Sequence, residues 1–180
     1  MTKVGIGLGL MAIAAGMIAL WPDPEPTRSP YGAQDSSEIR GLTPQEIDDL
    51  RAGRGAGFAR MAELNSYPGP RHVLDMADDL ELDASQRLAS RRIFEGMQQA
   101  AVRLGGEILS REQALSTAFA ERRVRSDSLE AESAAIGALY GQLRAVHLRA
   151  HVELTALLRP EQIVRYDELR GYHAGSDHAH

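Results

Sequence analysis

The chain contains no cysteine and few aromatic residues, and each shortage removes a class of protein. Without cysteine, its 180 residues cannot form disulfides, thiolate metal sites or a cysteine nucleophile. Aromatic residues make up 5% of the sequence, whereas Ala, Leu, Arg and Glu dominate from Asp83 onward. This composition is typical of long amphipathic helices. We therefore expect an all-α fold with one domain, because the chain is too short for two ordinary cores.

Positive charge and catalytic motifs are also lacking. Lys and Arg total 20 against 25 Asp and Glu, so the net charge is −5. Because phosphate contacts need a basic surface, we expect no nucleic acid as partner. The segment Gly53-Arg54-Gly55-Ala56-Gly57 lacks the Lys-Ser/Thr and the preceding strand of a phosphate loop, and a flexible hinge is the better interpretation. No Gly-x-Ser-x-Gly elbow and no His-Glu-x-x-His pair occurs, so we expect no enzyme.

A long hydrophobic run occurs at the N-terminus. Lys3 is followed by the uncharged residues 4–21, and Pro22, Pro24 and Pro26 end the run. The pattern is typical of an export signal, and its length lies between a signal-peptide core and the about 20 apolar residues of a membrane-spanning helix. No clear cleavage site follows, so residues 1–21 are either a signal anchor or a signal peptide. In both cases the rest of the chain crosses the inner membrane.

Composition divides the remainder into three parts. Residues 22–41 are rich in Pro, Ser, Asp and Glu and predict a disordered linker. Residues 42–172 carry the helical patterns and form the predicted domain. Residues 173–180 include three histidines but no core-forming residue, which predicts a flexible tail.

Two long helices dominate the predicted domain. Asp83 with Gln86 is a capping box that begins a helix reaching about residue 123, with Gly105-Gly106 as a soft spot. Asp127 with Glu130 predicts the start of the second helix. Apolar residues recur every seven positions in both, at Phe94, Ala101, Ile108 and Leu115 and at Leu129, Ile136, Leu143, Ala150 and Leu157. Matching rows and a short link predict a long antiparallel hairpin.

Shorter helices flank this hairpin. Thr43-Pro44-Gln45-Glu46 combines a capping residue, a first-turn proline and a reciprocal glutamate, and begins the first of them. Others are expected on either side of the turn Tyr67-Pro68-Gly69-Pro70 and after Pro160, ending at Gly171. A lone hairpin buries one face of each helix. We therefore expect the short helices to cover it and a homodimer to form.

The frame Leu-x-x-x-Gln occurs at two predicted helix starts, in Leu82-Asp83-Ala84-Ser85-Gln86 and in Leu158-Arg159-Pro160-Glu161-Gln162. With these motifs behind an export signal, residues 42–172 resemble the Spy/CpxP family of periplasmic chaperones and its heavy-metal-sensing relatives, whose signature is Leu-Thr-x-x-Gln (LTxxQ). Leu42-Thr43-Pro44-Gln45-Glu46 keeps the Leu-Thr start but has Glu in place of Gln. Asp83 and Arg159 replace Thr, and only Asp can still accept a capping hydrogen bond.

The resemblance implies a curved, dimeric helical cradle in the bacterial periplasm, either anchored to the inner membrane by residues 4–21 or released after cleavage. The expected function is that of an ATP-independent chaperone or envelope-stress modulator whose partners are unfolded envelope proteins. The alternative is a membrane-anchored heavy-metal sensor that contacts a membrane signalling partner. A structural dimer with neither activity is the third interpretation.

Two histidines one helical turn apart are the candidate metal ligands. His147 and His151 lie four positions apart on a predicted helix, so both imidazoles can reach one ion. Their place beside the apolar row puts them at the edge of the core. The competing interpretation is two ordinary surface histidines.

A metal ion needs a further ligand, which the segment around the Tyr67–Pro70 turn can supply. His72 follows the turn, and Glu63 and Met61 precede it. No cofactor is required by any motif, but neutral imidazole suits Zn, Ni, Co and Cu, whereas methionine favours Cu(I).

Overall fold

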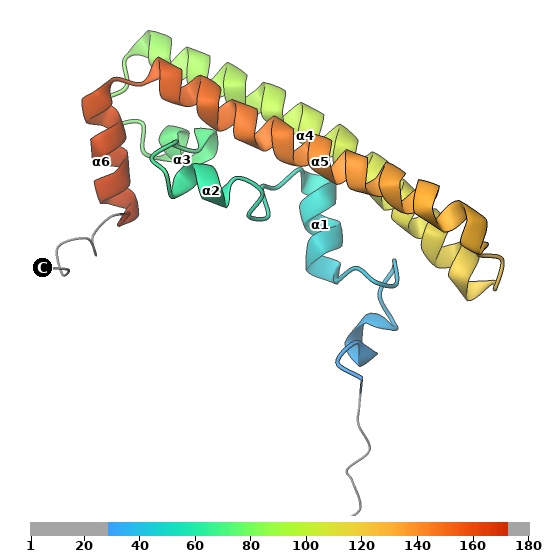
Figure 1. Ribbon diagram of the computed structural model, residues 1–180. Helices are drawn as coiled ribbons and strands as arrows, with labels where there is room; N and C mark the ends of the chain where they lie inside the picture. The colour runs from blue at the N-terminus through green and yellow to red at the C-terminus, as the bar shows by residue number, and fades with distance from the viewer. Residues whose placement is uncertain (1–28, 173–180) are drawn as a thin grey trace, which may run out of the picture. The chain divides into compact units, whose positions relative to one another are not determined.

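The computed structural model describes residues 29–172, in which every regular element is helical (Figure 1). The predicted export segment and the histidine-containing tail lie outside this range. Within residues 29–172, no helix is both long enough and apolar enough to cross a membrane. The prediction of an all-α fold is confirmed for this part of the chain. The elements are η1 (Gly32–Gln34), α1 (Pro44–Ala52), α2 (Arg60–Glu63), α3 (Pro70–Asp75), α4 (Ala84–Ala120), α5 (Ser126–Leu157) and α6 (Pro160–Arg170).

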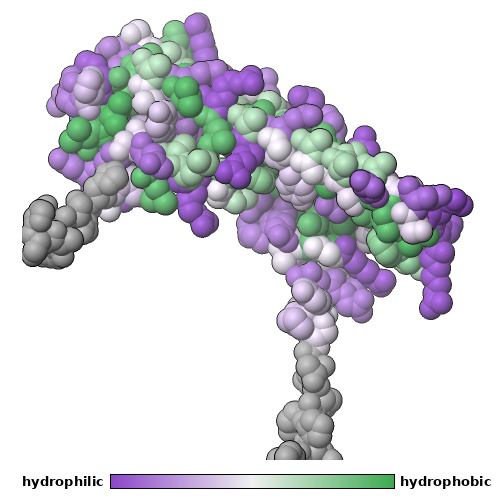
Figure 2. All heavy atoms as spheres, in the orientation of Figure 1, coloured by the Kyte–Doolittle hydropathy of each residue, from purple (hydrophilic) through white to green (hydrophobic). Residues whose placement is uncertain are grey.

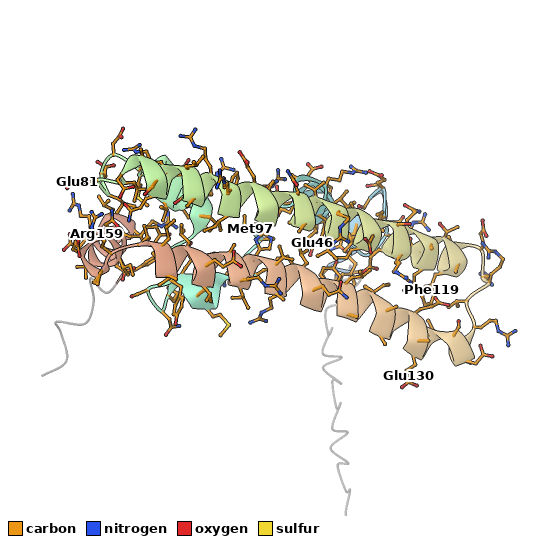
Figure 3. The ribbon with its side chains drawn as sticks, turned by 90° about the horizontal axis from the view of Figure 1, so that it is seen from above. Glu46, Glu81, Met97, Phe119, Glu130 and Arg159 are labelled. Atoms are coloured by element: carbon orange, nitrogen blue, oxygen red, sulfur yellow. The ribbon has the colours of Figure 1, made fainter. Side chains whose placement is uncertain are left out.

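The two long helices, α4 and α5, lie side by side along most of their length and run in opposite directions. Figure 3 shows Glu81 and Arg159 together at one end of this pair, and Phe119 and Glu130 together at the other. Helices α1, α2 and α3 all pack on one side of the pair, while α6 turns away from it after Leu158 (Figure 1).

Of the three capping boxes predicted at helix starts, two are present in the structure. Thr43 accepts from the backbone of Glu46, and Asp83 accepts from that of Gln86 at 2.8 Å, with both reciprocal bonds present. The predicted capping box at Asp127 is wrong. Helix α5 already begins at Ser126, and the Asp127 carboxylate binds the Arg125 guanidinium at 2.7 and 3.1 Å. A charged partner two residues away therefore takes the oxygens that would have capped the helix.

Buried apolar side chains form two clusters beneath the α4–α5 pair. The first joins the residues before and within α1 to the middle of both long helices, and the second joins α3 and its following turn to α5 and α6. The predicted heptad rows are buried at their centres, at Ala101, Ile108, Ile136, Leu143 and Ala150. Toward the far turn, Leu115 and Leu129 are only half-buried because no short helix covers that end.

The compact unit begins at Ala33, earlier than the predicted domain start at residue 42. Ile39 is 3% exposed and belongs to the first cluster. Burial of this side chain stabilises by about 1.5–3 kcal/mol, and the pairing of Glu38 with Arg51 also ties this stretch to α1. Residues ahead of position 42 therefore contribute to the buried core.

Gly105 is a packing position and not a soft spot in α4. The helix is continuous through Gly105 and Gly106. A Cβ atom on Gly105 would lie 2.0 Å from the carbonyl oxygen of Leu50, whereas one on Gly106 would meet nothing within 4 Å. The C-terminal end of α1 therefore rests directly on the α4 backbone at this glycine.

Candidate functional site

The two Leu-x-x-x-Gln motifs meet in the core. Gln86 and Gln162 are 5% and 3% exposed, and each amide donates to the other, at 2.8 and 3.1 Å. Gln86 also donates to the carbonyl of Leu157 at 3.2 Å, and Gln162 to that of Leu80 at 3.0 Å. Only a side chain that both donates and accepts satisfies this arrangement, which explains why each motif ends in Gln.

Each glutamine also closes the start of its own helix. The Asp83 amide donates to Gln86 at 3.2 Å, and the Arg159 amide donates to Gln162 at 2.9 Å. The third copy of the motif makes only local bonds, from the amide and the hydroxyl of Thr43 to the exposed Glu46 at 2.7 and 2.8 Å. Glu suffices there because no second motif faces it. The motifs therefore hold the starts of α4 and α6 together, which is a structural role.

A cleft of about 810 Å³ opens between the loop after α1, the α2–α3 segment, and the flanks of the long helices. Phe94, Met97 and Gln98 of α4 line one wall, and His147 and His151 of α5 line another. Glu63 and His72 of the α2–α3 segment also line it. Four of the five predicted ligands therefore face one cavity.

His151 is fixed by the turn that precedes α3. Its Nδ1 lies 2.8 Å from the carbonyl oxygen of Tyr67, which can only accept, so Nδ1 carries the proton. The other ring nitrogen, Nε2, then holds the lone pair that a metal or a donor group would use. With an exposed fraction of 6%, His151 is not a surface residue.

His147 is buried one turn earlier on α5, at 3% exposure. Its ring stacks on Phe58 with centroids 6.0 Å apart, and its Nε2 has no hydrogen-bond partner within residues 29–172. Burial, and then the neighbouring His151, lower the pKa of His147 below its usual value. The prediction that the pair sits at the edge of the core was wrong, because the short helices cover this stripe of α5.

Glu63 lies at the junction of three segments. Its Oε2 accepts from the hydroxyls of Tyr166 at 2.8 Å and Tyr172 at 2.9 Å. Its Oε1 and the Cε1 of His151 both border Gly69, where an added Cβ would lie 2.4 and 3.1 Å from them. A side chain at Gly69 would therefore collide with the carboxylate and crowd the imidazole.

Tyr166 connects this junction to α6. The ring is fully buried, and its hydroxyl accepts from the Gly69 amide at 3.2 Å while it donates to Glu63. Burial raises the pKa of Tyr166 well above its ordinary value, so the hydroxyl keeps its proton. In the sequence, Tyr166 was visible only as an aromatic residue on the apolar face of a predicted helix.

The two remaining predicted ligands lie in different places. His72 is half-buried on the wall of the cleft, where burial first and then Arg170 lower its pKa. Met61 does not line this cleft: it is 56% exposed, borders a smaller neighbouring cavity, and its sulfur accepts from Arg144 at 3.1 Å. In the part of the chain that the structure describes, no three His, Asp or Glu side chains converge on one point suited to a metal.

Comparison with protein-family models, with curated proteins and with solved structures finds no match for this chain. Its function therefore has to be argued from the cleft and the surface around it.

The neutral, buried state of His147 predicts an acid-sensitive fold. In the unfolded chain this imidazole takes a proton below about pH 6.5, whereas in the folded chain its lowered pKa resists protonation. The stability that the neutral His147 contributes to the fold is fully present above that pH and is lost as the pH falls through the folded-state pKa. The denaturant concentration at the unfolding midpoint should therefore decrease when the pH is lowered from about 7 to about 5.5.

The control for this experiment is the variant His147→Leu. Its denaturation midpoint should depend less on pH than that of the parent, and the dependence that remains should come from His72. An unchanged slope in the variant would show that His147 is not the group that titrates.

Proposed function

We propose that this protein is an exported, ATP-independent chaperone that holds apolar stretches of unfolded polypeptide. The observation that carries the proposal is the open cleft together with the apolar side chains left uncovered beside it. Met61, Leu64 and Tyr67 follow one another along α2 and its turn and are 56%, 54% and 40% exposed. Leu64 also lines the cleft.

The surface around the cleft supports this function because it mixes charge with apolar patches. Figure 2 shows apolar side chains interspersed with polar ones over the exposed face of the long helices and the segment beneath them. Exposed apolar groups are expected where a protein binds other chains, and surrounding charges keep such a protein soluble. The Spy/CpxP resemblance of the Leu-x-x-x-Gln motifs agrees with the proposal.

The experiment is an aggregation assay. Purified protein without nucleotide should delay the light scattering of several unrelated unfolding clients, with the delay growing as the molar ratio rises. Failure with every client at a several-fold molar excess would contradict the proposal.

A heavy-metal sensor is the second candidate, and a specific observation favours it. His147 is buried with an unpartnered ring nitrogen, and the His151 ring and the Glu63 carboxylate both border Gly69. A Zn, Ni, Co or Cu ion would draw its ligands from His147, His151, His72 and Glu63, after side-chain movement that brings them together. Met61 is left out of this set because it borders a different cavity.

Metal titration separates the two candidates. A chain ending at Tyr172 removes the three histidines of residues 173–180, which could chelate metal by themselves. This chain should bind at least one of the four metals more tightly than its His147→Ala/His151→Ala variant does. Affinity should weaken in acid, since only neutral imidazole binds metal. Equal affinity of parent and variant would remove the sensor from consideration.

We also propose that residues 4–21 export the chain to the periplasm and that the α4–α5 hairpin forms a homodimer there. A fusion of residues 1–40 to a reporter that is active only in the periplasm should be active. A cytosolic, inactive fusion would contradict export. Sedimentation equilibrium should give twice the monomer mass, and a monomer at all concentrations would contradict the dimer.

A further inference from the structure

The cleft carries positive charge that its own carboxylates do not balance. Four arginines line it, at positions 54, 60, 71 and 170, against the single carboxylate of Glu63. That carboxylate already accepts from two tyrosine hydroxyls. This local excess is unexpected in a chain whose net charge is −5, and it identifies the cleft as the place where an anion would be favoured.

Two of these arginines pair with carboxylates and two do not. Arg54 pairs with Asp49 at 2.5 Å, and Arg71 lies 3.8 Å from Asp75. Neither Arg60 nor Arg170 forms an ion pair with a carboxylate within residues 29–172. Both nevertheless line the cleft.

The surroundings of these two guanidinium groups differ. Arg170 stacks on the Tyr172 ring at 5.5 Å and donates to its hydroxyl at 3.1 Å. The Nη2 of Arg60 lies 3.1 Å from where a Cβ on Gly57 would be, so this guanidinium rests against the loop after α1. Both arginines are exposed, and a guanidinium that has no ion pair of its own can bind the carboxylate of a ligand, since its fork of N–H groups matches that geometry.

The rest of the cleft suits an apolar body. Phe94 and Met97 of α4, Leu64 and Pro70 provide carbon surface, and the volume of about 810 Å³ falls in the range of small-molecule sites. The imidazole of His147 lines the same wall, with its unpartnered Nε2 buried behind the surface. Apolar walls with a few convergent polar groups are the usual make-up of a ligand pocket.

We propose that this cleft binds an organic carboxylate that carries an apolar body, with Arg60 and Arg170 holding the carboxylate. The same chemistry is presented by the free C-terminus of a chain that ends in a hydrophobic residue and by a medium-chain fatty acid. The site does not depend on the chaperone or the sensor function. Its failure would leave aggregation suppression and metal binding untouched, and their failure would leave the site untouched.

Calorimetry on the full chain in zwitterionic lipid nanodiscs tests the site, with empty nanodiscs as the blank. The probes are N-acetyl-Leu-Leu with a free carboxylate, the same peptide with a C-terminal amide, octanoate, and acetate. We expect the free peptide acid, octanoate or both to bind, and the peptide amide to bind at least about tenfold more weakly than the acid or not at all. Whichever of the two acids binds more tightly identifies the source of the ligand.

Two double variants complete the test. Arg60→Gln/Arg170→Gln should weaken carboxylate binding at least about tenfold, whereas Arg92→Gln/Arg111→Gln, which changes two exposed arginines outside the cleft, should leave it within about twofold. Four results would overturn the site: no binding of either acid, equal binding of amide and acid, acetate binding as tightly as the larger acids, or an Arg60/Arg170 variant that binds like the parent. If the Arg60/Arg170 variant unfolds at a lower temperature than the parent, its binding data are set aside. The affinities of the parent for the peptide acid and for the peptide amide then decide whether the site exists.

Discussion

Gly105→Ala should lower the free energy of unfolding by about 3 kcal/mol, the upper part of the usual range for overpacking a core. The added methyl group would sit 2.0 Å from the carbonyl oxygen of Leu50 and 2.8 Å from its carbonyl carbon. Both are backbone atoms, so no side chain can rotate to make room. Relief requires α1 to move away from α4, which would open the first apolar cluster, where Leu50 is buried.

The neighbouring glycine supplies the control. A Cβ on Gly106 meets nothing within 4 Å, and alanine has a higher helix propensity than glycine, so Gly106→Ala should be neutral or stabilise by up to about 1 kcal/mol. Urea denaturation followed by circular dichroism measures both variants. Equal effects at the two positions would mean that α1 does not rest on α4 at Gly105.

Gln86→Glu should destabilise the fold by about 3 kcal/mol, because a charged group would then be buried without its hydrogen bonds. The amide nitrogen of Gln86 donates to the Leu157 carbonyl and to Gln162. A carboxylate at this position cannot donate and would face both acceptors. Arg159, whose Nη1 lies 3.4 Å from Gln86, would compensate for only part of the loss.

Gln99→Glu is the matched control on the same helix, since Gln99 is exposed. It should change stability by no more than about 0.5 kcal/mol. The same denaturation experiment compares the two variants. A Gln86→Glu protein as stable as the parent would show that the two motifs do not hold the helix starts together.

The long helices were predictable from sequence because their signals are local and repeated. The Asp83 capping box and the apolar recurrence every seven residues each specify α4 without reference to the rest of the chain. The short helices were harder to place. Helix α2 has only four residues and no side-chain cap, so tertiary contacts position it. Ile39 illustrates the same limit, since its burial depends on a cluster assembled from distant segments.

The candidate site was predictable in part. Spacing alone brought His147 and His151 onto one helix face. The carbonyl of Tyr67, in the turn expected to supply a further ligand, lies 2.8 Å from the Nδ1 of His151. The burial of the two histidines could not be predicted, because the covering residues come from a segment about 80 positions earlier in the chain. The pairing of Gln86 with Gln162 could not be predicted either, because the two glutamines also lie far apart in the sequence.

The arginines of the cleft were also missed. They are scattered along the sequence between positions 54 and 170 and follow no common period, so only the fold brings them to one cavity. An overall negative charge pointed away from any anion site.

Photo-crosslinking at the mouth of the cleft tests most directly whether this region holds unfolded clients. A photoreactive amino acid replaces either Leu64, which lines the cleft, or Leu88 on α4, which does not. The two leucines are 54% and 52% exposed, so a difference between them reports position and not accessibility. Under aggregation-suppressing conditions, strong crosslinking of an unfolding client at Leu64 and little at Leu88 is expected. Equal crosslinking at both positions, or none at Leu64, would contradict a client site at the cleft.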